Sequence, residues 1–168
     1  MAQFNLRDIP AQKLGVDIIY HIAYNIIVSV PNIVIDTNVV IAALRSKKGA
    51  SHRLLSLAGT EKYNTHDSVA LVLEYEDVIQ RHRVELGLSQ DDVSDLIDSL
   101  CALAKHHEIY FRWRPFLSYA NDETILVLAV SARCKYIVTH NIADFQGVEK
   151  FGIKAVTPSA FLRIIGEV

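Results

Sequence analysis

The chain is predicted to be a single α/β domain, because short buried strands alternate along it with amphipathic helices. Its 168 residues, 51% of them hydrophobic, suit one domain with a sizeable core. Two short apolar runs, Ile33–Ile35 and Tyr136–Val138, are each bounded by polar residues, as buried strands of a parallel sheet are. We therefore expect a central parallel sheet covered by helices on both faces.

The same patterning places the individual elements in order. The strongest helical pattern is the stripe of Leu71, Tyr75 and Val78, which repeats at i, i+4 and i+7. A second helix is apolar on most of its circumference from Ile125 to Val130. The predicted strands are residues 33–36, 62–65, 108–111, 136–139 and 154–156, and the predicted helices are 38–45, 50–58, 67–83, 89–104, 122–133 and 158–165.

Residues 1–31 are predicted to be an N-terminal extension to a domain that spans residues 32–168. An apolar stripe, repeating every four residues, indicates an added amphipathic helix of about four turns that ends before Pro31; it consists of Leu14, Ile18, Ile22 and Ile26. Such a face needs cover, so we expect it to dock on its own domain or on a second subunit in a homodimer. The alternative is that Val30 marks the natural start of translation.

Polar residues follow both buried strands at their carboxyl ends. Asp36 comes directly after the first strand and is followed by Thr37 and Asn38. The second strand leads into Thr139, Asn141 and, after one turn of loop, Asp144. In open parallel sheets this edge is where ligand crevices form. The two strand ends therefore predict a common polar site.

Two further acids belong to predicted helices. Glu74 interrupts the apolar stripe of the helix at 67–83, and Asp122 stands at the amino end of the helix at 122–133. Each acid also has a structural interpretation: Asp36 and Asp122 could be N-caps, Glu74 a partly exposed helix residue, and Asp144 a turn residue. Their joint occurrence favours a site, because two strand ends and two helix positions can converge only at one edge of one sheet.

With these motifs the chain resembles the PIN domain family, a ribonuclease fold found in many toxins of prokaryotic toxin–antitoxin pairs. The resemblance covers about residues 32 to 165 and rests on NIVIDTNVVIAAL, LVLEYEDVIQR, WRPFLSYANDETILVLAV, YIVTHNIADF and AVTPSAFL. It implies a three-layer fold with a central parallel sheet ordered 3-2-1-4-5 and flanked by helices. It also implies an acidic quartet with a supporting polar shell: Asp36, Glu74, Asp122 and Asp144, supported by Thr37, Asn38 and Thr139.

The chain departs from the family pattern at two places. Relatives commonly have an acid at the position of Asn141, and many have Asp-Pro where this chain has Ser118-Tyr119 or Tyr119-Ala120. A neutral Asn141 predicts weaker binding of one metal ion. The THNxxDF pattern recurs in one branch of the family, which favours Asp144 as the remaining ligand.

The ligand types select the cofactor and the reaction. A site of carboxylate oxygens favours Mg²⁺ or Mn²⁺, whereas the seven histidines show no paired zinc-ligand spacing. Four crowded carboxylates repel one another unless cations neutralise them, and a bound cation can activate water against a phosphodiester. We therefore expect a metal-dependent endoribonuclease acting on mostly single-stranded RNA, and the resemblance adds a possible cognate antitoxin as partner.

Composition limits the partners and the compartment. A net charge of −2 excludes a generally basic surface, so RNA contacts must be local. Arg112, Trp113 and Arg114 are candidates, with Trp113 either stacking on a base or belonging to the core. No apolar run reaches the length of a bilayer span, and two cysteines without CxxC spacing fit a reducing compartment. We expect a cytoplasmic protein without a membrane anchor.

Two other classes of function compete with the nuclease. A phosphotransferase with an aspartyl nucleophile needs a second acid two residues after Asp36, where this chain has Asn38. A catalytically silent PIN module that binds RNA or a protein partner is the stronger alternative, because Asn141 leaves the site less acidic than in relatives.

Overall fold

The structure is a computed structural model that describes residues 30–110 and 115–167. The predicted extension at residues 1–31 therefore lies outside the described residues, apart from Val30 and Pro31. Five parallel strands form one sheet in the order β3-β2-β1-β4-β5, which confirms the predicted order 3-2-1-4-5. The strands are β1 (Asn32–Ile35), β2 (Asn64–Asp67), β3 (Ala104–His106), β4 (Tyr136–Val138) and β5 (Lys154–Val156).

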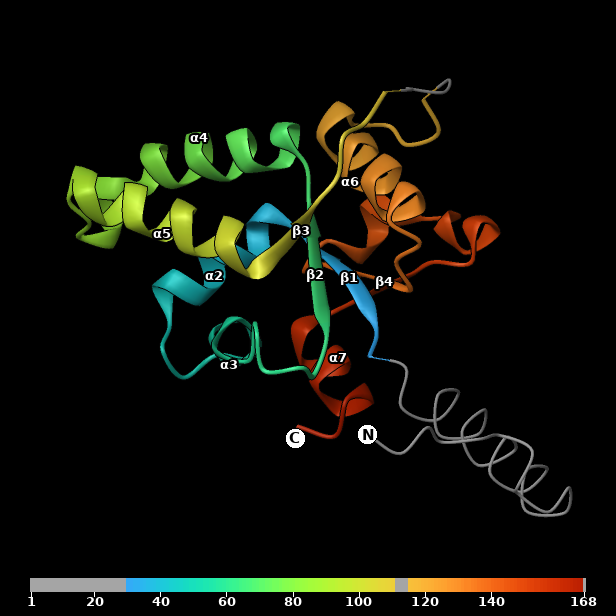
Figure 1. The fold of residues 1–168 in the computed structure, drawn as a ribbon, viewed down its shortest axis with the longest axis horizontal. Helices are drawn as coiled ribbons and strands as arrows, with labels where there is room; N and C mark the ends of the chain where they lie inside the picture. The colour runs from blue at the N-terminus through green and yellow to red at the C-terminus, as the bar shows by residue number, and fades with distance from the viewer. Residues whose placement is uncertain (1–29, 111–114, 168) are drawn as a thin grey trace, which may run out of the picture. The chain divides into compact units, whose positions relative to one another are not determined.

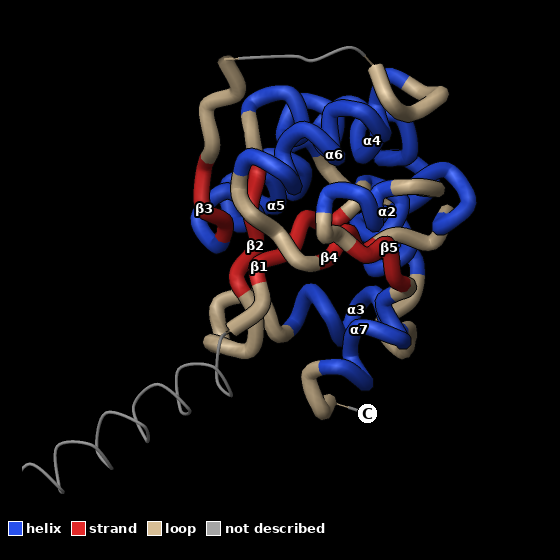
Figure 2. The backbone as a smooth tube through the Cα atoms, turned by 90° about the vertical axis from the view of Figure 1, so that its right-hand side faces the viewer, coloured by secondary structure: helices blue, strands red, loops and turns tan. Residues whose placement is uncertain are grey.

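Helices cover both sides of this sheet (Figure 1). They are α2 (Thr37–Arg45), α3 (Ala50–Ser56), α4 (Val69–Leu86), α5 (Gln90–Leu103), α6 (Ala120–Ser131) and α7 (Pro158–Ile164), with short 3₁₀ helices η2 (Ile142–Phe145) and η3 (Val148–Phe151). In Figure 1, α4 and α5 lie to the left of the strands and α6 to the right. The tube view in Figure 2 shows α6 and α4 together at one end of the strands, with α3 and α7 at the other. Within the described part of the chain, no helix is both long enough and apolar enough to cross a membrane.

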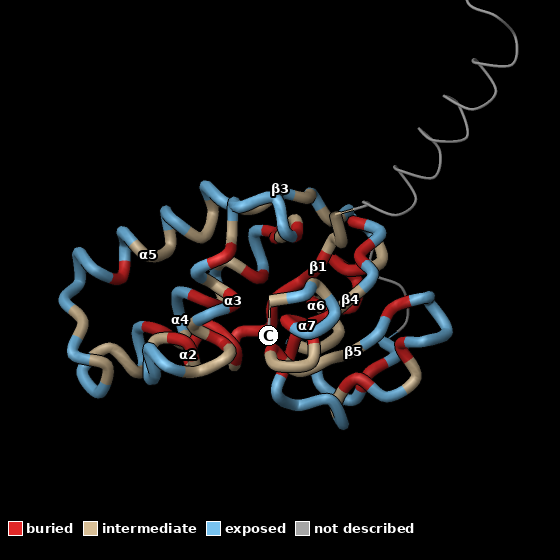
Figure 3. Tube along the Cα trace, turned by 90° about the horizontal axis from the view of Figure 1, so that it is seen from below, coloured by how far each residue is buried: buried red, intermediate tan, exposed pale blue. Residues whose placement is uncertain are grey.

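The core is centred on β1 and β4. Ile33 and Val34 of β1 and Ile137 and Val138 of β4 are completely buried. Val34 is paired with Ile137 in the parallel register. Because the two strands end level with each other, the residues after them emerge side by side. Figure 3 shows how buried positions gather in the middle of the molecule, whereas α5 is mostly exposed.

Two of the predicted strands are misplaced. The segment predicted as a strand at 62–65 forms β2 two residues later, at Asn64–Asp67. The strand predicted at 108–111 is wrong: residues 108–110 are irregular, and β3 is Ala104–His106, directly after α5. β3 is an edge strand with two exposed residues, so burial leaves no apolar run there. Ile109 packs against the core from the loop instead, which explains the misleading apolar signal.

Candidate active site

Asp36 lies at the carboxyl end of β1 and is both the N-cap of α2 and a member of the acidic group. Its side chain is only 6% exposed. Oδ1 accepts a hydrogen bond from the backbone N–H of Asn38 at 3.3 Å, and Oδ2 accepts from Asn38 Nδ2 at 2.7 Å and from Thr139 Oγ1 at 2.6 Å. Burial raises the pKa of this carboxyl, and these hydrogen bonds act in the opposite direction. The capping interpretation is thus correct for Asp36, and its role as a metal ligand stays a prediction.

Thr139 joins the ends of β1 and β4. Its hydroxyl is completely buried, donates to Asp36, and accepts from Asn38 Nδ2 at 3.1 Å and from the backbone N–H of Asn141 at 2.9 Å. Asn38 Oδ1 in turn accepts from the backbone N–H of His140 at 3.1 Å. This network fixes the rotamer of Asp36 and the path of the chain after β4.

Glu74 reaches the site from α4. Thr37 Oγ1 donates to its Oε1 at 2.9 Å, which ties α4 to the first turn of α2. The helix is held in place by Leu71 and by Tyr75, both buried, and the Tyr75 hydroxyl donates to the backbone carbonyl of Ile35. Burial is the main cause that raises the pKa of Glu74, and the nearby charge of Asp36 adds to it.

Asp122 and Asp144 complete the group. Asp122 lies in the first turn of α6, whose N-cap is Tyr119, so its carboxylate is not a helix cap. Its pKa is raised to about 6, first by burial and then by the charges of Asp36, Asp144 and Glu74. A carboxyl that responds to three others must lie near them. The charges of the other three predicted acids thus act on Asp122, although the four acids lie on different elements of the fold.

The donor chemistry of this group fits a hard divalent cation. All four side chains offer carboxylate oxygens, and the elevated pKa values reflect burial and mutual repulsion that a cation would relieve. As the side chains stand, no three His, Cys, Asp or Glu residues within 30–110 and 115–167 are grouped closely enough to hold a metal ion. The suitability of these residues for a divalent cation therefore rests on the type and the charge of their side chains.

A small cavity of about 320 Å³ opens beside the acids. Thr37, Asn38 and Glu74 line it together with Arg45 and His82, which lie further along α2 and α4. Arg45 forms an ion pair with Glu85 at 3.0 Å and is about half exposed. His82 follows Glu74 by eight residues on the same helix, which places it two turns away on a similar face.

The predicted RNA contacts Arg112, Trp113 and Arg114 lie outside the described residues. Asn141, the neutral residue where the resemblance led us to expect an acid, is exposed and precedes η2 as its N-cap. Asp144 lies within η2, and its backbone N–H donates to the carbonyl of Asn141 at 3.1 Å. Asp144 therefore follows β4 after one short 3₁₀ turn, and its charge raises the pKa of Asp122.

Comparison with known proteins identifies the family. A family model described as "PIN domain" matches residues 32–143. No curated protein matches the chain. The solved structure of VapBC-1 from nontypeable Haemophilus influenzae has a TM-score of 0.50 at 16% sequence identity, and the alignment covers 76% of this chain and 98% of that chain. At this identity the likeness shows the fold alone. Because the family model matches more than half of the chain, the protein belongs to the PIN domain family.

Proposed function

We propose that the protein is a divalent-metal-dependent endoribonuclease that hydrolyses phosphodiester bonds of single-stranded RNA. The observation that carries this proposal is that four carboxylates influence one another. Burial, together with the charges of Asp36, Asp144 and Glu74, raises the pKa of Asp122 to about 6. Structural ion pairs do not explain the group, since no Lys or Arg contacts Asp36 or Asp122 in the described part of the chain. Clustered acids without cationic partners are typical of metal-dependent phosphoryl chemistry.

The roles of the acids follow from their places. Asp36 and Asp122 would be the principal ligands of Mg²⁺ or Mn²⁺, Glu74 a direct or water-mediated ligand, and Asp144 the holder of a second ion or the group that orients the attacking water. When bound, such a cation supplies an acidified water and positive charge beside the phosphoryl oxygens.

The surrounding residues prepare the site for this task. Thr139 and Asn38 hold the carboxylate of Asp36 in one orientation, and Thr37 does the same for Glu74. Arg45, at the cavity beside Glu74, is placed to contact a phosphate of the bound strand. The protein thereby binds a backbone locally without a generally basic surface.

The cellular role belongs to the same proposal. Membership of the PIN family and the fold shared with VapBC-1 support a toxin that works with a cognate antitoxin protein. RNA substrate and free thiols both fit the cytoplasm, where we place the protein. Two subunits forming a homodimer complete the proposed assembly.

The deciding experiment is an RNA-cleavage assay with the purified full chain. Wild type is incubated with unstructured RNA in Mg²⁺, Mn²⁺ or chelator, beside Asp36→Asn and Asp144→Asn. We expect cleavage that requires the cation and that falls at least a hundredfold in both variants, because each loses a charged ligand while keeping its shape.

Asp95→Asn is the matched control, since it removes one negative charge from the exposed face of α5. Undiminished cleavage by Asp36→Asn would remove Asp36 from the mechanism, and undiminished cleavage by Asp144→Asn would remove the fourth ligand. RNA binding without any cleavage by wild type would instead establish the silent PIN module that the neutral Asn141 makes conceivable.

A further inference from the structure

The cavity of about 320 Å³ beside Glu74 is a groove between two helices, with an acid at one end and cations at the other. At the acidic end, Thr37 Oγ1 donates to Glu74 Oε1 at 2.9 Å. At the other end, Arg45 Nη2 lies 3.3 Å from His82 Nδ1. The two helices, α2 and α4, are thus joined at both ends of the cavity, which we call the α2–α4 groove.

The lining of the groove consists of two matching stripes, each with a residue at every fourth position of its helix. They are Thr37, Ile41 and Arg45 on α2 and Glu74, Val78 and His82 on α4. Residues at this interval follow one face of a helix. Eight residues of helix rise by about 12 Å, which is the length of the groove from its acidic end to its basic end. One phosphate group cannot span that length.

Positive charge gathers at the far end of the groove. Arg45 is the last residue of α2, and Lys47 and Lys48 follow it closely. Both lysines are exposed and form no ion pair in the described part of the chain. Cations at the end of a helix also interact favourably with its dipole, which is the simple structural explanation of this cluster. That explanation does not account for the open groove between the cluster and Glu74.

Glu85 holds Arg45 by one edge of its guanidinium. Arg45 Nε donates to Glu85 Oε1 at 3.1 Å, and Nη2 donates to Oε2 at 3.3 Å. Arg45 Nη1 donates to no group among the described residues. An exposed ion pair of this kind contributes little stability, but it keeps the guanidinium in one orientation, with N–H groups left to bind a phosphate. The charges of Lys47 and Lys48 exceed that of Glu85, so this end stays positive.

We propose that the α2–α4 groove holds the RNA strand beside the reacting phosphate and that Arg45 binds a second, non-reacting phosphate at its far end. The inference rests on the ribonuclease function proposed above and adds a requirement for substrate length. Arginine contacts to backbone phosphates fix the register of a nucleic acid without reading its sequence. Ile41 and Val78 form the apolar middle of the groove, so no other charge competes for the strand between the two ends.

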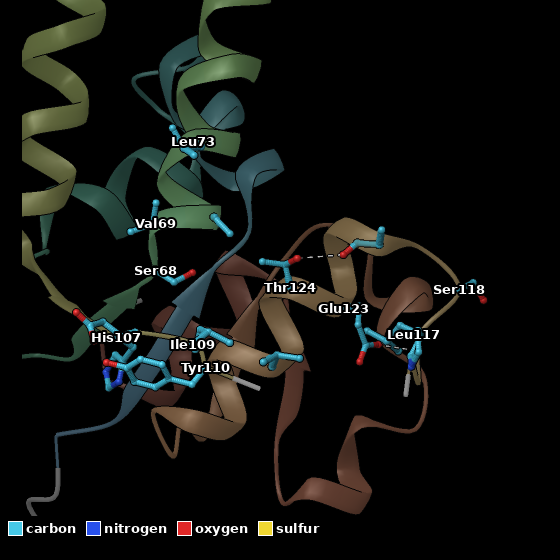
Figure 4. A pocket seen from close by; sticks show the side chains of 15 residues that line it. Ser68, Val69, Leu73, His107, Ile109, Tyr110, Leu117, Ser118, Glu123 and Thr124 are labelled. Atoms are coloured by element: carbon cyan, nitrogen blue, oxygen red, sulfur yellow. Dashed lines mark hydrogen bonds between the residues drawn. The ribbon is translucent and has the colours of Figure 1, made fainter. Parts of the chain in front are cut away.

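A larger cavity, of about 950 Å³, lies at the starts of α4 and α6 and lacks this charge pattern (Figure 4). Val69 and Leu73 of α4 line it, and none of its described lining residues is Lys or Arg. Its carboxylates, Glu108 and Glu123, would repel a phosphate. Of these two cavities, the α2–α4 groove is therefore the one suited to a polyanion.

The first test measures binding with the cation removed. Fluorescence anisotropy records the affinity of the full chain, in chelator, for a labelled single-stranded RNA at several salt concentrations. We expect Arg45→Gln to bind about tenfold more weakly than wild type at low salt, the effect of losing one charge-assisted contact. The slope of log affinity against log salt should fall in magnitude by about 0.7, the value for one phosphate of a single strand. Arg45→Lys keeps the charge and should retain most of the slope.

Arg53→Gln is the matched control. Arg53 is likewise an exposed arginine in an ion pair with a glutamate, Glu167, at 2.7 Å. It lies on α3 and does not line the groove. The control therefore removes the same charge and the same kind of ion pair elsewhere on the surface. Its affinity and salt slope should stay close to those of wild type.

The second test measures the length requirement by cleavage. An RNA that wild type cleaves in Mg²⁺ or Mn²⁺ is shortened stepwise from either end. The KM of wild type should rise about tenfold when the phosphate that reaches Arg45 is removed, with little change in kcat, because this contact is remote from the reacting atoms. Arg45→Gln should have a raised KM for the long RNA and no further step on shortening.

Two results would overturn the inference: an affinity and a salt slope of Arg45→Gln equal to those of Arg53→Gln, or a length step that persists in Arg45→Gln. Cation-dependent cleavage is compatible with either result, so the nuclease would stand while the role of the groove falls. RNA that is bound through Arg45 but never cleaved would instead overturn the nuclease and leave the groove as an RNA-binding site.

Discussion

At the scale of single residues, Asp36 shows how one side chain can stabilise the fold and destabilise it at once. Its carboxylate caps α2 and accepts from Asn38 and Thr139, which are favourable contacts. The same carboxylate is buried near Glu74 and Asp122 and raises the pKa of both. Strain of this kind is expected where function requires like charges to gather.

Asp122→Asn should stabilise the protein in a pH-dependent manner. Between its ordinary pKa of 3.8 and the folded value of about 6, the folded protein binds more protons than the unfolded chain. The contribution of Asp122 to stability is therefore fully present at low pH and is lost as the pH rises through 6. Above that pH the neutral amide should gain on the order of 1 kcal/mol, since partial exposure screens the repulsion.

Urea unfolding at pH 4 and at pH 7.5 measures this difference. The gain should appear at pH 7.5 and be small at pH 4, and Asp95→Asn on the exposed face of α5 should show neither effect. A variant that is less stable than wild type at pH 7.5 would show that the charge of Asp122 is compensated rather than repelled.

At the scale of secondary-structure elements, the site depends on how β1, β4 and α4 are tied together. The Thr139 hydroxyl connects the ends of the two strands, and the Tyr75 hydroxyl connects α4 to the carbonyl of Ile35 in β1. Asp36 thus follows β1 directly, and Glu74 comes from a helix that is hydrogen-bonded to β1. Such ties keep carboxylates in position despite their repulsion.

Thr139→Val should loosen this connection while preserving shape. The change leaves the backbone N–H of Asn141 without its acceptor and removes one of the two acceptors of Asn38 Nδ2. It also removes a donor from the buried carboxylate of Asp36. We expect a loss of about 1 to 3 kcal/mol in the free energy of unfolding. Thr139→Ser keeps the hydroxyl and should lose less than about 1 kcal/mol for one methyl group.

The pH profile of cleavage gives a second measure of the same variant. The Thr139 hydrogen bond lowers the pKa of Asp36, so its removal should shift the acidic limb of the profile to higher pH. If Thr139→Val had the stability and the pH profile of wild type, the Thr139 hydroxyl would not be needed to position Asp36.

The elements also show what the sequence could predict. β1 and β4 could be predicted because a strand buried on both faces needs a run of apolar residues between polar ends. The polar ends of these runs in turn indicated Asp36 and Thr139. β3 could not be predicted in this way, because an exposed edge strand needs no apolar residues. The contacts of Glu123 could not be predicted for a related reason: its carboxylate accepts from the backbone N–H groups of Phe116 and Leu117, whose path only the folded chain reveals.

At the scale of the whole molecule, the described domain accounts for the family match and for the four acids, whereas the predicted extension at residues 1–31 lies outside it. The apolar stripe of that extension remains a prediction from the sequence alone. The fold class and the sheet order are confirmed, because they depend on the patterning of strands and on a resemblance that the family model supports.

Deletion of residues 1–29 should leave the domain folded and change its assembly. We expect the shortened chain to be smaller in solution, as a monomer instead of a dimer, or to melt several degrees lower if the helix docks on its own domain. Light scattering and thermal unfolding measure the two effects. An unchanged mass together with an unchanged melting temperature would exclude the docking of this segment.

The parallel pairing of β1 with β4 also sets the moment at which activity can begin. Asp36 and Thr139, which meet at the ends of these strands, are 103 residues apart in the sequence. Contacts of such long range form late in folding, and a chain under synthesis folds only as its later segments emerge from the ribosome. A nascent chain that stops before β4 holds Asp36 and Glu74 but has neither the strand partner nor Asp144. If the protein is the ribonuclease proposed above, it would therefore be inert throughout most of its own translation and would become active only near completion, beside the messenger RNA that encodes it.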